Sequence, residues 1–480
     1  MTPNPLWVAL HFPRLPLEAN APLPSPSAVV ENARVVLADE AAQAAGIAHG
    51  SGVAAARMLA PSITLLARSR SREATAMQTL ACWAGAFTPR VSLTPDTLLL
   101  EVGSCLRLFG GLDELLGGAG GINAGVQAQG FTAALAVAPT MLGAQWLAQA
   151  GTAARCRDRD SLCQQLERLT INVLPERIAA ALHGFGARRL GDVRRLPGAE
   201  LARRVGTDCR QLMARAFGEI AEARAEFVFP DRLALSLELP SAVEHAAALL
   251  FATRRLSSAL SGYLAARQCG VREFNLTLVH RQRETRLALQ FSAPTADQAR
   301  FERVLREQLA QLTLTAPVDA LRLEATQLTA LAGRNQALFN DEQGGHEAIG
   351  TLLERFAARL GEAQVYRLAV HDDHRPECAT RRIAPFATAK TGACRVLPRP
   401  LWLVDPPQPL IEVDGRPCRR GPLKLLAGPE RIEAGWWDDG EANGDVRRDY
   451  FIALSDDGCW LWIYRDARLP GGWFLHGFFS

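Results

Sequence analysis

The order in which strand-like and helix-like segments follow one another limits the fold of this 480-residue chain more than any other feature. Three short apolar runs in its first part have the length and composition of buried strands: Leu6–His11, Arg34–Ala38 and Thr97–Val102. Helical segments lie between them, such as the one that starts at Asp39 and stops at Gly46. This alternation predicts an α/β or α+β first domain.

Later regions have different patterns, which predicts several domains. Residues 171–220 have helical spacing, whereas 272–280 and 285–291 alternate apolar and polar positions as strands of a half-exposed sheet do. Beyond residue 400 come six of the nine tryptophans. The composition, 48% hydrophobic and 21% charged, excludes a disordered chain, a collagen-like fibre and a coiled coil. The predicted fold class is α+β multidomain, with a β-rich C-terminal region.

The net charge does not indicate a binding partner, whereas the cysteines indicate a cellular compartment. A formal net charge of +3 does not by itself predict a polyanionic partner. Residues 115–154 are uncharged, but glycines and glutamines make them too polar to span a membrane. No export signal is visible, and the ten cysteines are scattered without a C-x-x-C pair. We therefore expect reduced, mostly buried thiols in a cytoplasmic protein without a membrane anchor.

One segment has the form of a DNA-binding helix–hairpin–helix. In Leu182–Val193, Gly184 and Gly186 allow a tight turn whose N–H groups can point at a phosphate, and Arg188 and Arg189 are expected on the following helix. Residues 176–224 hold ten arginines against six acids, so this region is locally basic. The alternative interpretation is a plain helical turn with a solvated charged face.

The order of these features resembles that of the Y-family translesion DNA polymerases. Residues 35–61 resemble the fingers segment of that family, and Leu100–Gly110 resembles its second palm strand. The hairpin follows where the family has its thumb, and the α+β unit follows where it has its little finger. The resemblance covers about residues 5–330. It implies the following division: palm and fingers 1–165, thumb 166–228, little finger 229–330, linker 331–348 and a C-terminal partner-interaction region 349–480.

The residues that hold catalytic metal in the family are largely missing. Y-family polymerases place two aspartates on the first palm strand and an Asp-Glu pair before the second. Here Ala9 and His11 hold the first two positions, Asp96 is kept, and Thr97 stands in place of the glutamate. Because one carboxylate cannot hold two Mg²⁺ ions, we expect no catalytic residues, no metal and no cofactor.

The contacts to the incoming nucleotide are also altered. In the family, a tyrosine and an arginine bind the triphosphate, and these two residues align with Glu40 and Gln43. The palm lysine of the family aligns with Met141. Within the family, the chain is therefore most similar to the non-catalytic members of bacterial mutagenesis cassettes. That similarity implies a DNA-damage-induced adaptor whose partners are primer-template DNA, the sliding clamp, a RecA-like protein and an error-prone C-family polymerase.

Two other functions stay open at this point. The first is an active but divergent translesion polymerase that uses Asp96, Glu101 and Glu18. On a regular strand, Glu101 should point to the opposite side from Asp96, which argues against shared metal ligation. The second is a general DNA-binding protein without a clamp or polymerase partner.

A short peptide after the little-finger region resembles the clamp-binding motif. In Asn335–Phe339, Leu338 and Phe339 are adjacent apolar anchors and Gln336 supplies a polar contact, although it lies one position closer to Leu338 than the consensus requires. The alternative is a buried hydrophobic pair in a short helix.

The C-terminal region holds two further candidates. The aromatic segments 447–451 and 472–479 are expected either to recruit a partner or to form the core of a small β-rich unit. His371–His374 and Cys378 do not have a recognised zinc spacing, so no metal site is predicted there and His374–Glu377 is interpreted as structural.

Overall fold

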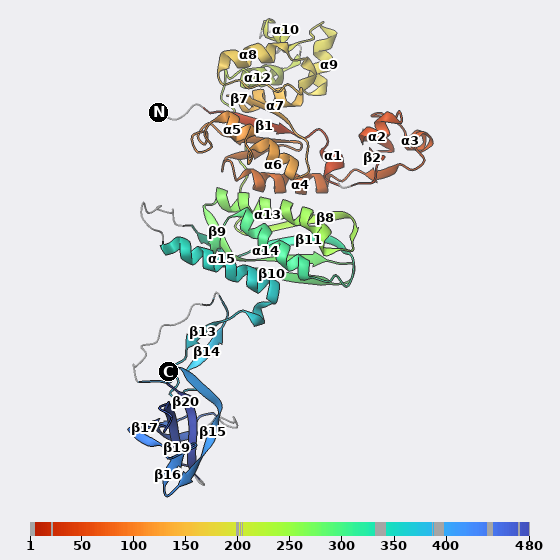
Figure 1. The fold of residues 1–480 in the computed structure, drawn as a ribbon. Coiled ribbons are helices and arrows are strands. Elements are labelled where there is room, and N and C mark those ends of the chain that lie inside the picture. Colours follow the sequence, from red (N-terminus) through yellow and green to blue (C-terminus); the bar gives the residue numbers. More distant parts are fainter. Residues whose placement is uncertain are drawn as a thin grey trace. The chain divides into compact units, whose positions relative to one another are not determined.

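The computed structural model describes residues 5–20, 23–197, 201, 203, 205–331, 342–385, 387, 398–438, 445–468 and 471–479 (Figure 1). Its contacts divide the chain into two compact units, Met1–Arg359 and Leu360–Ser480. None of the helices in the described ranges has the length and apolarity needed to cross a bilayer. The described cysteines are free thiols, but only Cys82, Cys156 and Cys209 are fully buried, fewer than expected.

A four-stranded antiparallel sheet forms the palm-like part of the first unit. Its order is β5 (Val91–Leu93), β6 (Thr97–Glu101), β1 (Trp7–His11) and β7 (Ala134–Ala138). Alternate residues of β1 face two different cores: Val8 packs in the core that includes α4, whereas Ala9 packs in the core that includes α7. The helices of this part are α1 (Leu15–Glu18), α4 (Arg70–Ala84), α5 (Leu112–Gly117), α6 (Ile122–Ala128) and α7 (Met141–Gln149).

The fingers-like part is a small sheet with two helices and a core of its own. Asp39 caps its first helix, because its carboxylate accepts a hydrogen bond from the N–H of Ala42 at 2.8 Å. Gly46, at φ +90°, adopts the left-handed conformation expected after that helix. Its elements are β2 (Ser27–Glu31), β3 (Arg34–Ala38), α2 (Glu40–Ala44), α3 (Val53–Leu59) and β4 (Thr64–Ala67), with strand order β3-β2-β4.

The thumb-like part is helical, as its spacing indicated. Its apolar residues continue the core on the α7 side of the palm-like sheet, where Leu162 and Leu182 are fully buried. Its described elements are α8 (Arg159–Arg168), the 3₁₀ helix η1 (Ile171–Val173), α9 (Glu176–Gly184), α10 (Leu190–Arg194) and α12 (Thr207–Ala216).

The little-finger-like part is an antiparallel sheet with strand order β10-β9-β11-β8, and the short strand β12 also pairs with β9. The two alternating segments of the sequence, 272–280 and 285–291, lie in β9, a central strand, and in β10, an edge strand. Helices α13 and α14 cover one face. The elements are β8 (Leu233–Val243), the 3₁₀ helix η2 (Ala246–Ala248), α13 (Leu249–Ala266), β9 (Cys269–Val279), β10 (Glu284–Thr295), α14 (Gln298–Gln311), β11 (Val318–Ala325) and β12 (Leu328–Ala330).

Helices α4 and α13 pack against each other at a pair of glycines. A Cβ atom on Gly85 would lie 2.5 Å from the carbonyl oxygen of Gly262, and one on Gly262 would collide with the carbonyl oxygens of Cys82 and Trp83. Only glycines allow the two backbones to approach this closely. The palm-like and little-finger-like parts consequently share one continuous hydrophobic core.

The region after the little finger differs from the expected linker. Helix α15 (Glu342–Leu360) starts inside the range 331–348, and its Glu354 accepts hydrogen bonds from the N–H of Ser292 at 2.6 Å and from Nε of Arg300 at 2.8 Å. Because this buried carboxylate holds α15 against β10 and α14, the first unit extends to Arg359, beyond the boundary expected at 349.

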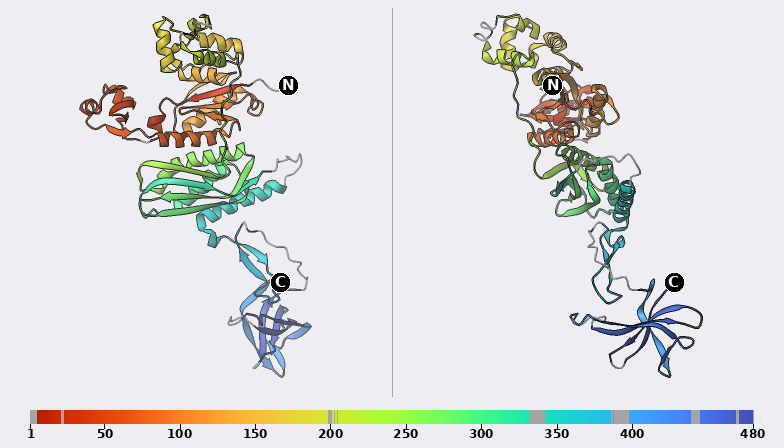
Figure 2. Two further views of the ribbon diagram at one scale, coloured as in Figure 1. Left: turned by 180° about the vertical axis from the view of Figure 1, so that it is seen from behind. Right: turned by 90° about the vertical axis from the view of Figure 1, so that its left-hand side faces the viewer.

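The second unit is rich in strands, as predicted. A six-stranded antiparallel sheet has the order β16-β15-β20-β19-β18-β17, and Figure 2 shows its strong twist. Tyr450, Trp462 and Trp473 are buried, so much of the aromatic sequence forms core, whereas Trp436 and Trp437 are exposed. The elements are the 3₁₀ helix η3 (Glu362–Gln364), β13 (Arg367–Val370), β14 (Thr380–Ile383), β15 (Trp402–Val413), β16 (Arg416–Cys418), β17 (Lys424–Ala434), β18 (Val446–Leu454), β19 (Trp460–Asp466) and β20 (Gly472–Phe478).

Candidate functional site

The ends of β1 and β6 bring together the positions where the family has its metal ligands. The strand register places His11 opposite Thr97. The hydroxyl of Thr97 donates to Oδ1 of Asp96 at 2.9 Å, and Nδ1 of His11 lies 3.2 Å from the same hydroxyl oxygen. Since the threonine has a single proton and gives it to Asp96, Nδ1 of His11 acts as the donor to Thr97. Imidazole, hydroxyl and carboxylate thus form one hydrogen-bonded chain.

This arrangement does not fit the pair of Mg²⁺ ions that a Y-family polymerase needs. Ala9 is fully buried and offers a methyl group, and Asp96 is the one acid of the four positions. Its carboxylate already accepts hydrogen bonds from two threonines, Thr97 and Thr94. Two hard divalent cations require several oxygen ligands, and the described residues hold no cluster of three or more His, Cys, Asp or Glu side chains.

The other acids of the divergent-polymerase alternative do not converge on Asp96. Glu101 lies at the far end of β6, opposite Trp7, about 17 Å along the strand at ~3.4 Å per residue. Its buried carboxylate accepts hydrogen bonds from the N–H of Gly103 at 2.9 Å and from the hydroxyl of Ser104 at 2.8 Å. Glu18 accepts a hydrogen bond from the N–H of Thr132 at 2.9 Å. Glu101 is thus held by neighbouring residues, and Glu18 by a backbone N–H that is 114 positions away in the chain.

The positions aligned with nucleotide contacts are also engaged within the chain. Glu40 forms an ion pair with Arg14 at 3.0 Å, and Nε2 of Gln43 donates to the carbonyl of Ala38 at 2.7 Å. Met141 is the first residue of α7, and the following N–H, that of Leu142, donates to the carboxylate of Glu222 at 2.9 Å. An internal carboxylate therefore already occupies the end of α7 that would attract a phosphate.

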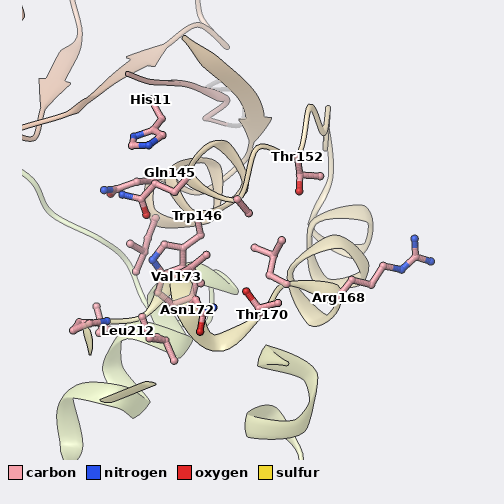
Figure 3. Close-up of a pocket in the computed structure, with 15 residues that line it drawn as sticks. His11, Gln145, Trp146, Thr152, Arg168, Thr170, Asn172, Val173 and Leu212 are labelled. Carbon is pink, nitrogen blue, oxygen red and sulfur yellow. The ribbon is translucent and has the colours of Figure 1, made fainter. Parts of the chain in front are cut away.

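A groove of about 790 Å³ lies beside His11, between α7 and η1 (Figure 3). Its polar lining consists mainly of amides and hydroxyls, among them Gln145, Asn172 and Thr170, and Trp146 adds an apolar wall. Among the described residues that line it, Arg168 is the one permanent cation and none is a carboxylate. This lining can hydrogen-bond a neutral polar surface but lacks the charge to hold a triphosphate.

The hairpin forms where it was predicted, but its N–H groups are used internally. Gly184 ends α9, and Gly186, at φ +80°, makes the turn while its N–H donates to the carbonyl of His183 at 3.0 Å. The N–H groups of Arg188 and Arg189 donate to the carboxylate of Asp192, at 3.1 and 2.9 Å. These two hydrogen bonds hold the pKa of Asp192 below its usual value. In this structure the N–H of Gly186 is therefore not free for a phosphate, and DNA binding by the hairpin stays a prediction.

The placement of the two arginines also differs from expectation. Arg189 is the N-cap residue of α10 and Arg188 precedes it, so neither lies on the helix. Both side chains are exposed and remain the part of the hairpin that is available to a phosphate. Sequence reasoning missed Asp192, because it stands at the N3 position of a capping box but the N-cap residue, Arg189, is not the Ser or Thr by which that motif is recognised.

The open face of the little-finger-like sheet is not basic. The strand registers place Arg286 and Arg322 on the face turned away from α13 and α14. Three glutamates share that face: Glu273, Glu284 and Glu324. Arg322 forms an ion pair with Glu284 at 3.4 Å. The better candidates for phosphate contacts in this part of the protein are therefore Arg281 and Arg283. Both are exposed in the turn between β9 and β10.

Residues from the His371–Cys378 region form structural contacts in the second unit. Arg375 forms ion pairs with Asp373 at 2.7 Å and Asp438 at 2.6 Å, and Glu377 accepts a hydrogen bond from Arg448 at 2.8 Å. These contacts tie the β13–β14 hairpin to the six-stranded sheet. The clamp-motif candidates Gln336, Leu338 and Phe339 lie outside the described residues.

Sequence comparison first shows which class of protein the chain resembles. Residues 20–168, which include the fingers-like part and most of the palm-like part, match the model of the impB/mucB/samB family. The solved structures with similarity include a Dbh ternary complex (16% identity, TM-score 0.37, 66% of this chain and 98% of the other). They also include DinB from Sulfolobus solfataricus (15% identity, TM-score 0.37, 68% of this chain and 100% of the other).

The particular resemblance is to Protein ImuB. Over 468 residues, the chain is 27% identical to Protein ImuB of two strains of Caulobacter vibrioides, and the match covers 91% of this chain and 100% of theirs. The similarity extends through the thumb-like, little-finger-like and C-terminal regions as well as the part that matches the family model. The expected resemblance to the Y-family-like mutagenesis proteins, and to ImuB among them, is confirmed.

Proposed function

We propose that this protein is a non-catalytic Y-family-like adaptor in DNA-damage-induced translesion synthesis and mutagenesis. The observation that carries the proposal is the site at the ends of β1 and β6, where Asp96 is hydrogen-bonded to Thr97 and the residues that the structure describes form no cluster of three or more metal-ligating side chains. A single carboxylate cannot hold the two metal ions that activate a primer hydroxyl in a polymerase. The protein would keep the fold of a polymerase and use it to bind DNA and partner proteins.

DNA contact in this proposal is made by arginine side chains and is independent of sequence. Arg188 and Arg189 at the thumb hairpin and Arg281 and Arg283 at the β9–β10 turn are the exposed cations that support it. Contacts of this kind neutralise phosphates, so affinity for primer-template DNA would fall steeply with salt. The groove beside His11, whose polar lining is mainly amides and hydroxyls, would accommodate sugar and base edges rather than phosphates.

The protein partners in the proposal follow from the resemblance to ImuB. They are the sliding clamp, through Gln336, Leu338 and Phe339, an ImuA-type RecA-like protein, and an error-prone C-family DNA polymerase. The exposed Trp436 and Trp437 of the second unit suit a protein interface, because large aromatic side chains contribute strongly to binding. The setting would be the cytoplasm, at the nucleoid.

Primer extension separates the adaptor from an active polymerase. The full chain is given primer-template DNA and all four nucleotides with Mg²⁺ or Mn²⁺, beside an active Y-family polymerase as a positive control. We expect DNA binding without nucleotide incorporation. Incorporation that Asp96→Asn removes would instead establish a divergent polymerase. Clamp pull-down with Leu338 and Phe339 changed to alanine then distinguishes the adaptor from a general DNA-binding protein, because the adaptor should lose the clamp and keep DNA.

A further inference from the structure

Arg255, in α13, is buried without a hydrogen-bond or ion-pair partner among the residues that the structure describes. It is 6% exposed, and its Nε is shielded from solvent with no hydrogen-bond acceptor. Its guanidinium lies over the ring of Phe131, 4.8 Å from the centroid. Arg300, equally buried in the same unit, is by contrast hydrogen-bonded to Glu354 and Ser292. A buried cation without a hydrogen-bonded counter-charge is unfavourable, so the contrast marks Arg255 as unusual.

The nearest acid does not neutralise this charge directly. Glu18 interacts with Arg255 electrostatically, but it makes no ion pair with it and its Oε2 accepts the N–H of Thr132. Burial lowers the pKa of Arg255 to about 10, against the opposing influence of Glu18. The side chain is therefore still a cation at neutral pH. Among the described residues, its charge has a cation–π contact with Phe131 and the influence of Glu18, but no ion pair.

A cavity of about 220 Å³ lies directly beside Arg255. It is far larger than the roughly 10–15 Å³ needed for one water. A second cation, Arg72, lines it and is fixed by Asn20 at 2.7 Å and by an ion pair with Glu238. Hydroxyl groups make up most of the remaining polar lining: Ser71, Thr75, Thr79 and Ser236.

The lining favours an anion over a cation or an apolar ligand. Glu238, the one acid in it, is already paired with Arg72, which leaves the guanidinium of Arg255 as the uncompensated charge. Thr75 and Thr79 donate their protons to helix carbonyls, so Ser71 and Ser236 are the hydroxyls better placed to donate to a ligand. Guanidinium and hydroxyl donors together are the groups that hold tetrahedral oxyanions.

We propose that this cavity binds a phosphate-type oxyanion on Arg255, with Ser71, Ser236 and Arg72 around it. The site is separate from the palm-like site and does not depend on the adaptor function. Because α4 supplies Ser71 and Arg72 while α13 and β8 supply Arg255 and Ser236, the ion would join the palm-like and little-finger-like parts. The phosphate group can come from free inorganic phosphate or from the 5′ end of a DNA strand.

Calorimetric titration of the full chain with inorganic phosphate, at constant ionic strength set with chloride, tests the site. We expect saturable binding of one phosphate, and at least a tenfold loss of affinity in Arg255→Met. The matched control is Arg254→Met, because Arg254 is the adjacent arginine of α13 but is exposed and paired with Glu302. It should bind phosphate like the wild type. Equal affinity in Arg255→Met and wild type, or no saturable binding, overturns the proposal.

Thermal unfolding supplies a second readout that a purely structural arginine would not give. Phosphate should raise the melting temperature of the wild type and of Arg254→Met but not that of Arg255→Met. Without phosphate, Arg255→Met should melt no lower than the wild type, because it removes an uncompensated buried charge. If Arg255→Met does not fold, Arg255→Lys replaces it, and undiminished phosphate affinity in that variant counts against a site that depends on the guanidinium fork.

Two single-stranded oligonucleotides that differ only in a 5′-phosphate identify the source of the group. Tighter binding of the phosphorylated strand, lost in Arg255→Met, supports a DNA end as the ligand. Equal binding of both strands, together with Arg255-dependent binding of inorganic phosphate, supports the free ion.

Discussion

Nδ1 of His11 lies 3.2 Å from the hydroxyl oxygen of Thr97, across the ends of two neighbouring strands. The same hydroxyl donates to Asp96, so imidazole, hydroxyl and carboxylate form one hydrogen-bonded chain. It lies at the positions that the resemblance aligns with the paired acids of the polymerase family. These local hydrogen bonds connect the polar groups at the two strand ends to one another.

Replacing Thr97 with valine tests whether the hydrogen bonds among His11, Thr97 and Asp96 stabilise the fold. Thr97→Val keeps the shape of the fully buried side chain but removes the donor to Asp96 and the acceptor for His11. We expect a loss of about 1–2 kcal/mol in the free energy of unfolding, measured in urea, because Asp96 can be rehydrated. DNA affinity should not change. A change in DNA affinity at unaltered stability would place Thr97 in the binding surface instead.

The thumb arginines should contribute to DNA affinity through phosphates alone. In Arg188→Ala and Arg189→Ala, binding to primer-template DNA should weaken equally for unrelated sequences. The slope of log affinity against log salt should fall by about 1 for each variant. Fluorescence anisotropy over a salt series measures both. Arg254→Ala is the control, since that arginine is exposed but lies on α13. An unchanged slope in both thumb variants would remove the hairpin from the interface.

Asp192 should oppose DNA binding at the same hairpin. Its carboxylate takes the N–H groups of Arg188 and Arg189, and its charge partly offsets theirs. Asp192→Asn removes that charge and weakens the two hydrogen bonds, so DNA binding should tighten roughly threefold at low salt while the hairpin loses stability. Anisotropy at 50 mM and 300 mM salt checks the effect, which should shrink at the higher concentration. Weaker DNA binding in this variant would mean that the cap positions the arginines.

Local signals account for the parts of the fold that the sequence predicted well. The cap at Asp39 and the left-handed Gly46 define the ends of α2 through neighbouring residues, and the alternation in 272–280 matches β9 because one face of that strand is buried. The lack of an acid on β1 is likewise visible in the sequence itself.

Features that depend on distant residues could not be predicted in the same way. The docking of α15 rests on Glu354 meeting Arg300, 54 positions away in the chain. The acidic face of the little-finger-like sheet appears only when the strand registers place Glu284 and Glu324 on the same side as Arg322. Burial of Arg255 requires the packing of α4 against α13, which no local pattern indicates.

The glycine contact between α4 and α13 should be intolerant of a methyl group. In Gly262→Ala the new Cβ meets two backbone carbonyl oxygens, which cannot move without shifting α4. We expect a loss of at least ~2 kcal/mol in the free energy of unfolding, even though alanine is the better helix former. Gly117→Ala is the control, because a Cβ at the end of α5 meets no atom within 4 Å. Equal stability of the two variants would show that the helices can separate.

The second unit should lose stability in mild acid through one buried histidine. Nδ1 of His476 lies 2.8 Å from the hydroxyl of Tyr450, and burial lowers the pKa of the imidazole to about 4. The unfolded chain, with an ordinary histidine pKa near 6.5, takes up the proton first, so stability is complete above pH 6.5 and is lost as the pH falls from 6.5 towards 4. The loss can reach about 3 kcal/mol, at ~1.4 kcal/mol per pKa unit.

Chemical denaturation of the full chain between pH 7.5 and pH 4.5, followed by tryptophan fluorescence, measures this dependence, since Trp462 stacks near His476. His476→Gln should flatten the profile across that window, at some cost in stability at pH 7.5. His371→Gln should keep the wild-type profile, because His371 is an exposed histidine of the same unit. A profile that stays steep in His476→Gln would assign the acid sensitivity to other groups, with the buried Glu377 and Arg448 pair next to be tested.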